Sequence, residues 1–268
     1  MGMITARPSK NLAPYVKFFW SVESCTPLSY RFRVVPSGLP ELMILSGALP
    51  GSTDPRKCFD DHSLLCGQQA GPYEILISEK LSLFSIVFNP VALFRIFHIP
   101  AAEFFNRNIP LNLVLKHETD ELETEISAAG AFDRKLQIAE RFVLDRLKKV
   151  RDEHALPRMQ KAVEIINHSG GSVSVNTMAS AACLSRKQFE RRFSEFIGST
   201  PGQFLKIIRF QQALHQKNRN PHISLAALAL DCGYFDQSHM SNDFKQLTGL
   251  TPRSYFAQCE PFSDYFSF

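Results

Sequence analysis

Residues 185–204 read SRKQFERRFSEFIGSTPGQF, and residues 236–255, which begin 51 positions later, read DQSHMSNDFKQLTGLTPRSY. The coinciding pairs are Ser185 and Asp236, Phe189 and Met240, Phe193 and Phe244, Phe196 and Leu247, Gly198 and Gly249, Thr200 and Thr251, Pro201 and Pro252, and Phe204 and Tyr255. Large apolar residues, glycines and prolines therefore recur at one fixed offset. An internal repeat of this kind indicates one supersecondary unit that the chain uses twice.

The same offset is predicted to continue upstream, where small apolar residues gather. It pairs Val175 with Ala226, Met178 with Ala229 and Ala182 with Gly233. Each copy then has a short helix, a tight turn (Cys183-Leu184, or Gly233-Tyr234-Phe235) and a longer helix that Ser185 or Asp236 caps. Small residues on the first helix let the second cross it closely, which is typical of a helix-turn-helix unit.

The longer helix of each copy is predicted to be amphipathic. Phe189, Phe193 and Phe196 recur at spacings of four and three, and so do Met240, Phe244 and Leu247. The opposite faces carry Arg186, Lys187, Glu190, Arg191 and Ser194 in the first copy, and Gln237, Ser238, Ser241, Asn242 and Lys245 in the second. Arg, Asn, Gln and Glu side chains can pair with base edges. Exposed polar positions without a task are the alternative, but the repetition argues against chance.

Between the copies, Pro201 is predicted to begin a helix that runs to about Gln216 and bridges the two units rigidly. Lys206 and Arg209 are expected on its exposed side. Such a bridge could place two recognition helices in successive major-groove segments, roughly 34 Å apart. Thr200 and Thr251 could cap the following helices and also offer N–H groups to phosphate, or they could act as caps alone.

Charge and composition narrow the function. The 268 residues carry a net charge of +4, and residues 157–256 hold 12 Lys/Arg against 6 Asp/Glu, whereas residues 1–156 balance. The basic C-terminal part predicts a polyanionic partner, although a solvated basic face is the alternative. No apolar run approaches ~18 residues and no secretory signal is visible, which predicts a cytoplasmic protein without a membrane partner. The six widely spaced cysteines predict reduced thiols and no zinc site.

The N-terminal part is predicted to be rich in strands, because short apolar and aromatic runs are broken by Pro, Gly, Ser and Asp. Candidate strands are Val16–Val22, Tyr30–Val35, Glu41–Leu45, Glu74–Ser78 and Leu83–Phe88, and candidate helices are Val91–His98, Asp120–Ala129 and Asp133–Arg151. Many short strands indicate an antiparallel barrel or sandwich. The apolar stripe on the last helix could be core packing, a dimer seam, or both.

Residues 157–256 resemble the C-terminal DNA-binding domain of the AraC/XylS family of bacterial transcription regulators. The resemblance rests on Ala226-Ala227-Leu228-Ala229, Gly233-Tyr234-Phe235-Asp236-Gln237-Ser238-His239-Met240, Phe244-Lys245 and Gly249-x-Thr251-Pro252-x-x-Tyr255. It implies that Lys187, Glu190, Arg191, Gln237, Ser238 and Asn242 face bases, with His239, Ser241 and Lys245 nearer the backbone. Glu190 departs from the family pattern, and pairing with a neighbouring arginine is the expected result.

Residues 8–115 resemble the β-rich regulatory domains of this family, on Phe88-Asn89-Pro90, Leu93-Phe94-Arg95-Ile96-Phe97 and the stretch from Ile99 to Leu111. In that family such a domain often binds an effector and helps dimerisation. Phe18, Trp20, Phe32, Phe84 and Phe88 could enclose a small apolar ligand, although a packed core is the favoured interpretation. Arg31 and Arg33 could hold an acid, with outward exposure expected instead.

The predicted fold is therefore α+β with two domains: an N-terminal β-barrel or cupin-like domain with trailing helices, and an all-α domain with two helix-turn-helix motifs joined by a linker helix. The predicted ranges are 1–115 for the β-rich domain, 116–156 for the helical connector, 157–258 for the DNA-binding domain and 259–268 for a tail. A catalytic metal-cupin domain is disfavoured, because His62, His98 and His117 stand alone and no catalytic motif occurs.

The predicted function is a sequence-specific, DNA-binding transcription regulator with no enzyme activity, cofactor or metal. Its expected partner is a double-stranded operator. RNA polymerase, a small-molecule effector and a second copy of the chain are further candidate partners. The alternative is the same DNA-binding module with an N-terminal domain that serves only dimerisation or a protein partner.

Overall fold

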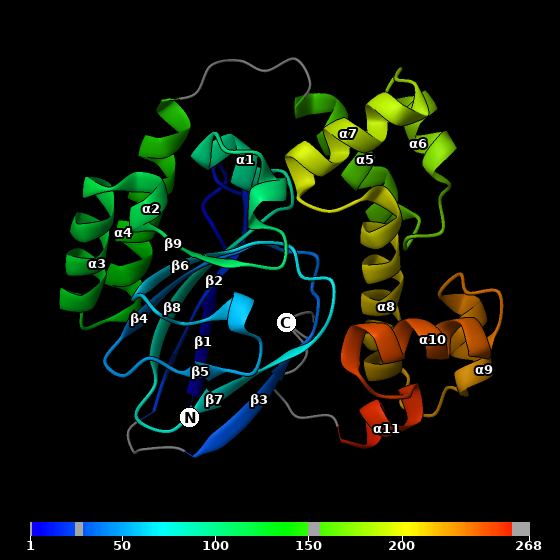
Figure 1. Ribbon diagram of the computed structural model, residues 1–268, viewed down its shortest axis with the longest axis horizontal. Coiled ribbons are helices and arrows are strands. Elements are labelled where there is room, and N and C mark those ends of the chain that lie inside the picture. The colour runs from blue at the N-terminus through cyan, green and yellow to red at the C-terminus, as the bar shows by residue number, and fades with distance from the viewer. Residues whose placement is uncertain (1, 25–28, 150–155, 259–268) are drawn as a thin grey trace.

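The computed structural model describes residues 2–24, 29–149 and 156–258 (Figure 1). Cys25, Cys259, the predicted tail 259–268 and residues 150–155 near the end of the predicted connector lie outside the described residues. Strands occupy the N-terminal part and helices the C-terminal part, so the predicted α+β class is confirmed.

The strands form two antiparallel sheets, with orders β1-β2-β8-β4-β6-β9 and β3-β7-β5. Their bounds are β1 Gly2–Ala6, β2 Val16–Glu23, β3 Tyr30–Val34, β4 Glu41–Ser46, β5 Gly51–Ser52, β6 Ser63–Cys66, β7 Tyr73–Ile77, β8 Ser82–Phe88 and β9 Asn108–Pro110. Within the described residues no ladder joins the two sheets, so they do not close into the predicted barrel. They pack instead through one shared core.

Alternation along the strands of the larger sheet makes two cores, one on each face. On β8, Leu83 and Val87 face the smaller sheet, whereas Phe84, Ile86 and Phe88 face the helices. The five aromatic residues considered as one ligand enclosure are divided accordingly. Phe18, Trp20 and Phe32 lie between the sheets, and Phe84 and Phe88 lie on the helical side. They therefore do not line a common cavity.

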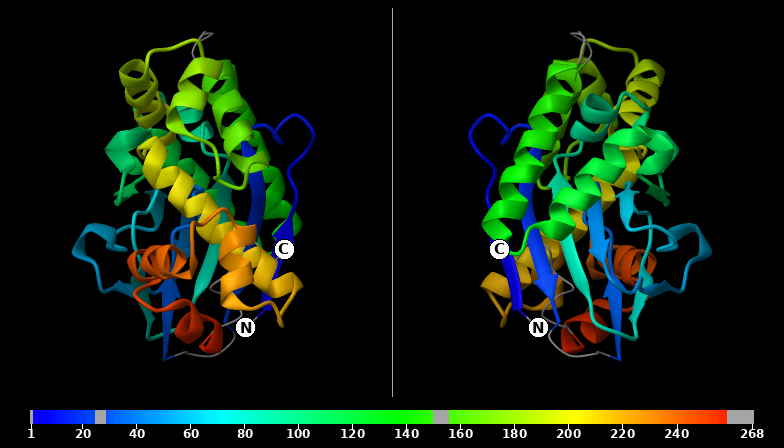
Figure 2. Two further views of the ribbon diagram at one scale, coloured as in Figure 1. Left: turned by 90° about the vertical axis from the view of Figure 1, so that its right-hand side faces the viewer. Right: turned by 90° about the vertical axis from the view of Figure 1, so that its left-hand side faces the viewer.

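Helices cover the second face of the larger sheet, as the right-hand view of Figure 2 shows. These helices are α1 Ala92–Phe97, η2 Ala101–Phe104, α2 Asn112–Leu115, α3 His117–Ala128 and α4 Phe132–Lys148, whereas η1 Pro55–Lys57 lies beside Tyr73 of the smaller sheet. The apolar stripe of α4 packs into this core: Ala139 and Val143 are fully buried, and Phe142 lies against them. Core packing therefore accounts for the stripe.

A carboxyl group is buried in the core between the two sheets. Trp20 Nε1 donates a hydrogen bond of 2.7 Å to Glu41 Oε1, and Ser85 Oγ donates to the same oxygen. Burial raises the pKa of Glu41 to about 7, against the lowering effect of the two hydrogen bonds. Burial also raises the pKa of the Cys66 thiol on β6 nearby. The inner face of this sandwich thus contains several titratable groups that favour their neutral forms.

The C-terminal part contains α5 Leu156–His168, α6 Val175–Ala181, α7 Arg186–Ile197, α8 Pro201–Arg219, α9 Leu225–Asp231, α10 Gln237–Thr248 and α11 Pro252–Ala257. They build two small cores, one on each half of α8. Phe193 packs against Phe204 in the first, and Phe244 packs against Phe210 in the second. The left-hand view of Figure 2 shows α8 passing in front of the strands. One long helix therefore carries both helix pairs.

Candidate nucleic-acid interface

Matching caps define the two helix pairs α6–α7 and α9–α10. Ser174 and Ser224 cap the first helices through the backbone N–H groups of Thr177 and Ala227. Ser185 and Asp236 cap the second helices, as predicted. Gly198 and Gly249 end those helices with φ angles of +93° and +77°, a conformation that favours glycine. The repeat in the sequence is therefore a repeat of structure.

The predicted register is wrong upstream of the turns. The two first helices are 50 residues apart, and the buried pairs are Met178 with Leu228, Ala179 with Ala229 and Ala182 with Cys232. Cys183 (φ +53°) and Gly233 (φ +75°) occupy the same left-handed turn position. The offset becomes 51 because the second turn has one residue more. That additional residue is Phe235.

Phe235 is the functional candidate that sequence reasoning missed. Its side chain is 87% exposed at the N-terminal end of α10, although it belongs to the apolar class. Its backbone N–H donates to His239 Nδ1 at 3.4 Å, which is a long bond. The one-residue insertion relative to the first turn is the sequence signal that could have found it.

The outward face of α7 carries the predicted polar residues. Arg186 Nε lies 2.9 Å from Glu190 Oε1, one helical turn away, so the expected pairing of Glu190 with an arginine is present. Arg192 is paired with Glu195 at 2.9 Å. Within the described part of the chain, Lys187 and Arg191 are exposed and make no ion pair. Two cations on this face are therefore available to a ligand.

The outward face of α10 is polar but carries less charge. Gln237, Ser238, His239, Asn242 and Lys245 are exposed, and Ser241 is half-buried. Met240, Phe244 and Leu247 are buried on the opposite side, as the spacing predicted. This surface offers amide, hydroxyl, imidazole and ammonium groups, which suit hydrogen bonds to base edges and phosphates.

Lys206 and Arg209 on α8 are not the freely exposed cations that the sequence predicted. Both approach the buried carboxylate of Asp243 on α10, at 3.7 Å and 3.6 Å. Lys206 Nζ also donates to Gln246 Oε1, and Arg209 donates to the Gly171 carbonyl. Their side chains are only 24% and 17% exposed. The buried carboxylate of Asp243 belongs to a different helix, so the spacing of residues along α8 could not reveal these contacts.

Thr200 and Thr251 act as helix caps. Thr200 Oγ1 accepts from the N–H of Gln203, and Thr251 Oγ1 accepts from the N–H of Ser254, each at 3.2 Å. Thr200 is exposed and Thr251 is half-buried. Both threonines therefore cap the helix that begins at the following proline.

The linker helix sets the separation of the two pairs. It has 19 residues, and at 1.5 Å per residue it spans about 28 Å. Figure 1 shows α7 near one end of α8 and α10 beside the other. That span is comparable with one turn of B-DNA, roughly 34 Å. The two polar faces therefore belong to helices packed near opposite ends of one long helix.

The N-terminal part contacts both helix pairs. The rings of Phe94 on α1 and Phe196 on α7 are 4.3 Å apart. Gln211 on α8 donates to the Pro36 carbonyl at 2.7 Å, and Val35 lies in the core of the second pair. These contacts use buried sides of α7 and α8 and leave Lys187 and Arg191 exposed. The N-terminal part therefore packs against both helix pairs through α1 and the segment that follows β3.

Comparison with known proteins agrees with this geometry. Residues 178–258 match a family described as a helix-turn-helix domain, and residues 4–110 match one described as a domain of unknown function. An uncharacterized HTH-type transcriptional regulator of Haemophilus influenzae is 31% identical over 93 residues, which are 35% of this chain and 31% of that protein. A protein of Streptomyces antibioticus, named as an AraC-like transcription regulator, is 34% identical over 84 residues, which are 31% of this chain and 27% of that protein.

Residues 178–258 form a helix-turn-helix domain of the AraC type. A solved AraC-type transcriptional regulator from Chromobacterium violaceum aligns with 39% of this chain and 95% of its own, at 26% identity and a TM-score of 0.35. This chain covers less than a third of the length of either curated relative.

Three features concern residues 2–24, 29–149 and 156–258. Among them, no three His, Cys, Asp or Glu side chains are grouped so that they could hold a metal ion. No described helix has the length and apolar character needed to cross a membrane. Cys58, Cys66, Cys183 and Cys232 are free thiols.

Proposed function

We propose that this protein is a transcription regulator that binds double-stranded DNA sequence-specifically through α7 and α10. The observation that carries the proposal is the doubled helix pair with matching caps and an exposed polar face on each second helix. Each pair acts as one helix-turn-helix unit. The second helices enter successive major-groove segments while α8 sets their spacing.

The proposed contacts divide into two kinds. Lys187, Arg191, Gln237, Ser238 and Asn242 read bases, because they are exposed near the N-terminal or central turns of α7 and α10. Arg186 and Glu190 form an ion pair, which must open before either residue can contact DNA. The residues proposed to lie nearer the phosphates are His239, Ser241, Lys245, Thr200 and Thr251. The main role of Lys206 and Arg209 is to neutralise the buried carboxylate of Asp243, and contact with phosphate is a minor role.

The rest of the organisation is proposed with the function. The ranges 1–115, 116–156, 157–258 and 259–268 are the sensor or interaction domain, the connector, the DNA-binding domain and the tail. The two-sheet domain is a cupin-like fold that a small molecule controls. The protein acts in the cytoplasm without enzyme activity, and a second copy or RNA polymerase joins it at the operator.

Arg191→Ala is expected to lower affinity for the preferred site by roughly 1–3 kcal/mol and to flatten the preference at one base pair. The reason is that Arg191 is an exposed, unpaired guanidinium on the reading face of α7 among the described residues. The measurement is selection of bound sites from random DNA with the full chain, followed by titration of the selected duplex and its single-base variants.

Arg192→Ala is the matched control, because it removes the same charge from the next residue, whose guanidinium is held by Glu195. It should leave the selected sequence unchanged. Equal losses for the two variants on every duplex would make Arg191 a general phosphate contact. Failure of the unaltered protein to enrich any sequence would contradict the proposed function.

Phe235 is proposed to touch the DNA as well, through the methyl group of a thymine. An aromatic side chain with 87% exposure contributes little to packing, so Phe235→Ser should change the free energy of unfolding by less than about 0.5 kcal/mol. We expect it to reduce preference for an A·T pair next to the site of Gln237. Titration of duplexes carrying thymine or uracil at that position measures the methyl contact directly.

Leu230→Ser provides the control, since Leu230 is a second exposed apolar residue but lies on α9. It should keep the preference of the unaltered protein for the thymine duplex over the uracil duplex. Thymine and uracil duplexes that bind the unaltered protein equally would contradict a methyl contact by Phe235.

A further inference from the structure

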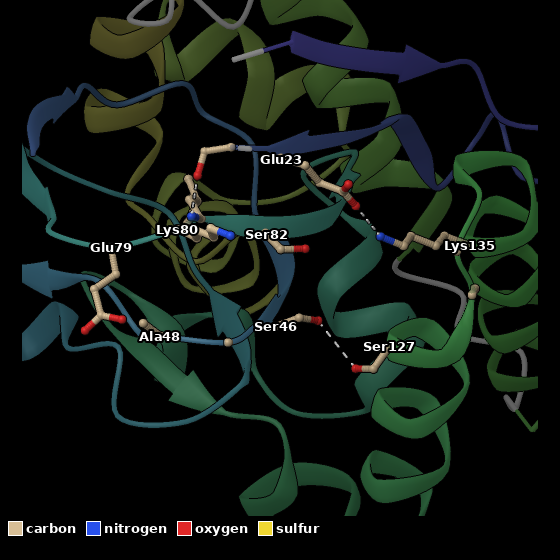
Figure 3. A pocket seen from close by; sticks show the side chains of 13 residues that line it. Glu23, Ser46, Ala48, Glu79, Lys80, Ser82, Ser127 and Lys135 are labelled. Carbon is tan, nitrogen blue, oxygen red and sulfur yellow. Dashed lines mark hydrogen bonds and ion pairs between the residues drawn. The ribbon is translucent and has the colours of Figure 1, made fainter. Parts of the chain in front are cut away.

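A polar cavity of about 670 Å³ lies at the ends of β2, β4 and β8, beside the ends of α3 and α4 (Figure 3). Its volume is in the range of small-molecule sites. Its lining includes Glu23, Ser46, Lys80, Ser82, Ser127 and Lys135. This cavity lies at the end of the sheets, away from the exposed faces of α7 and α10.

Lys135 is the decisive residue of the cavity. Its side chain is 9% exposed, and its Nζ lies 2.8 Å from Glu23 Oε1. The Glu23 side chain is 58% exposed. Burial of an ammonium group is costly unless an opposite charge satisfies it. Here a largely solvated carboxylate supplies that charge, so a ligand carboxylate could take its place at small cost.

The other lining groups favour a polar ligand. Ser46 Oγ on β4 and Ser127 Oγ on α3 point toward one another across 3.4 Å, a long contact (Figure 3). Their hydroxyl groups therefore retain hydrogen-bonding capacity for a third molecule. Glu23 and Glu79 balance Lys80 and Lys135, so the charged side chains of the lining sum to zero.

This balance distinguishes among ligand classes. An apolar ligand would cover these charges without pairing them, and a dianion would meet the two carboxylates. A zwitterion exchanges partners instead: its carboxylate pairs with Lys135 and its ammonium group pairs with Glu23. Neither member of the ion pair then loses an opposite charge.

We propose that this cavity binds a free α-amino acid, with Lys135 holding the carboxylate and Glu23 the ammonium group. The amino acid is the effector of the regulator, and that part of the inference rests on the proposed function. Contacts connect the site with α7. Lys135 lies on α4, whose Arg146 donates to the Ile96 carbonyl of α1 at 3.1 Å, and α1 carries Phe94 against Phe196.

The test uses the purified full chain without DNA and the twenty standard L-amino acids as probes, each in a thermal-unfolding titration. We expect one amino acid, or a chemically related group, to raise the Tm saturably. Its methyl ester and its N-acetyl derivative should each bind at least tenfold more weakly. Absence of a saturable shift with all twenty would overturn the proposal, as would equal binding of either derivative.

Variants locate the binding. Lys135→Met and Glu23→Gln should each weaken binding of the active amino acid at least tenfold, whereas Lys148→Met, an exposed residue of the same helix, should not. Glu23→Gln alters an exposed side chain and keeps the test decisive if Lys135→Met fails to fold. Unchanged affinity in Glu23→Gln would overturn the assignment.

The effector role has its own measurement. The active amino acid should change affinity for the selected duplex at least threefold in the unaltered protein and not in Glu23→Gln. Binding without any change in DNA affinity would overturn the effector role. Site selection needs no amino acid and the thermal titration needs no DNA, so the proposed function and this inference fail separately.

Discussion

Phe210→Ala is expected to lower the free energy of unfolding by about 3–5 kcal/mol, the range for removing a buried aromatic side chain. Phe210 is fully buried on α8, and its ring meets Phe244 of α10 at 4.9 Å and Tyr255 of α11 at 6.1 Å. Denaturant unfolding of the full chain measures the loss. Because whole domains are stable by only about 5–15 kcal/mol, the effect is a large share.

The consequence for DNA binding should be local. Phe210 packs α8 against the second helix pair. Phe210→Ala should therefore weaken the protein's protection of the DNA half-site read by α10 more than that of the half-site read by α7. Phe204→Ala is the matched variant, since Phe204 packs against Phe193 of the first pair at 5.7 Å. It should show the reverse pattern. If both variants weaken the two half-sites equally, α8 does not carry two separately seated units.

Glu41→Gln is expected to remove a pH-dependent change of about 3 kcal/mol in the free energy of unfolding. This is the free energy that corresponds to raising the pKa of Glu41 from 4.5 to about 7. The folded state holds the proton more tightly than the unfolded state. The contribution of Glu41 to stability is therefore greatest below about pH 4.5 and is lost as pH rises through about 7, where folded Glu41 must ionise. Glutamine keeps an oxygen that accepts from Trp20 and Ser85 but cannot ionise.

The measurement is the difference in free energy of unfolding between the unaltered protein and Glu41→Gln, taken from pH 4.5 to pH 8. The unaltered protein should lose about 3 kcal/mol relative to the variant across that window. Glu121→Gln, at an exposed position of α3, controls for the loss of one carboxyl group. A difference that stays constant with pH would show that water reaches Glu41 and that it titrates as an ordinary glutamate.

Local patterns predicted much of the C-terminal architecture. Capping residues, the spacing of Phe189, Phe193 and Phe196, and the Gly-x-Thr-Pro segments are all short-range signals. The helix predicted from Pro201 to about Gln216 is present as Pro201–Arg219, and the caps at Ser185 and Asp236 are present as well. The N-terminal strands were predicted less completely. β6 (Ser63–Cys66) is buried on both faces and therefore lacks the alternation that marks a half-buried strand.

Other features depended on residues that are distant in sequence. The upstream register was wrong because a single offset of 51 was applied across the turn, where the second copy has one additional residue, Phe235. The predicted exposure of Lys206 and Arg209 on α8 was wrong because both side chains approach Asp243 on α10, which is more than thirty residues away in the sequence. The closed barrel was not found, since strand closure depends on pairing between distant strands.

By itself, the sequence determined the doubled helix pair, its caps and its polar faces, since helix periodicity and capping act over three or four residues. Tertiary structure alone decided which cations remain free, which aromatic residues share a core, and that Lys135 lies buried beside Glu23 in a cavity. Those outcomes depend on contacts between segments that are distant in sequence, because a buried charge is stable only where the fold brings an opposite charge next to it. Charge counts along the chain contain no such information.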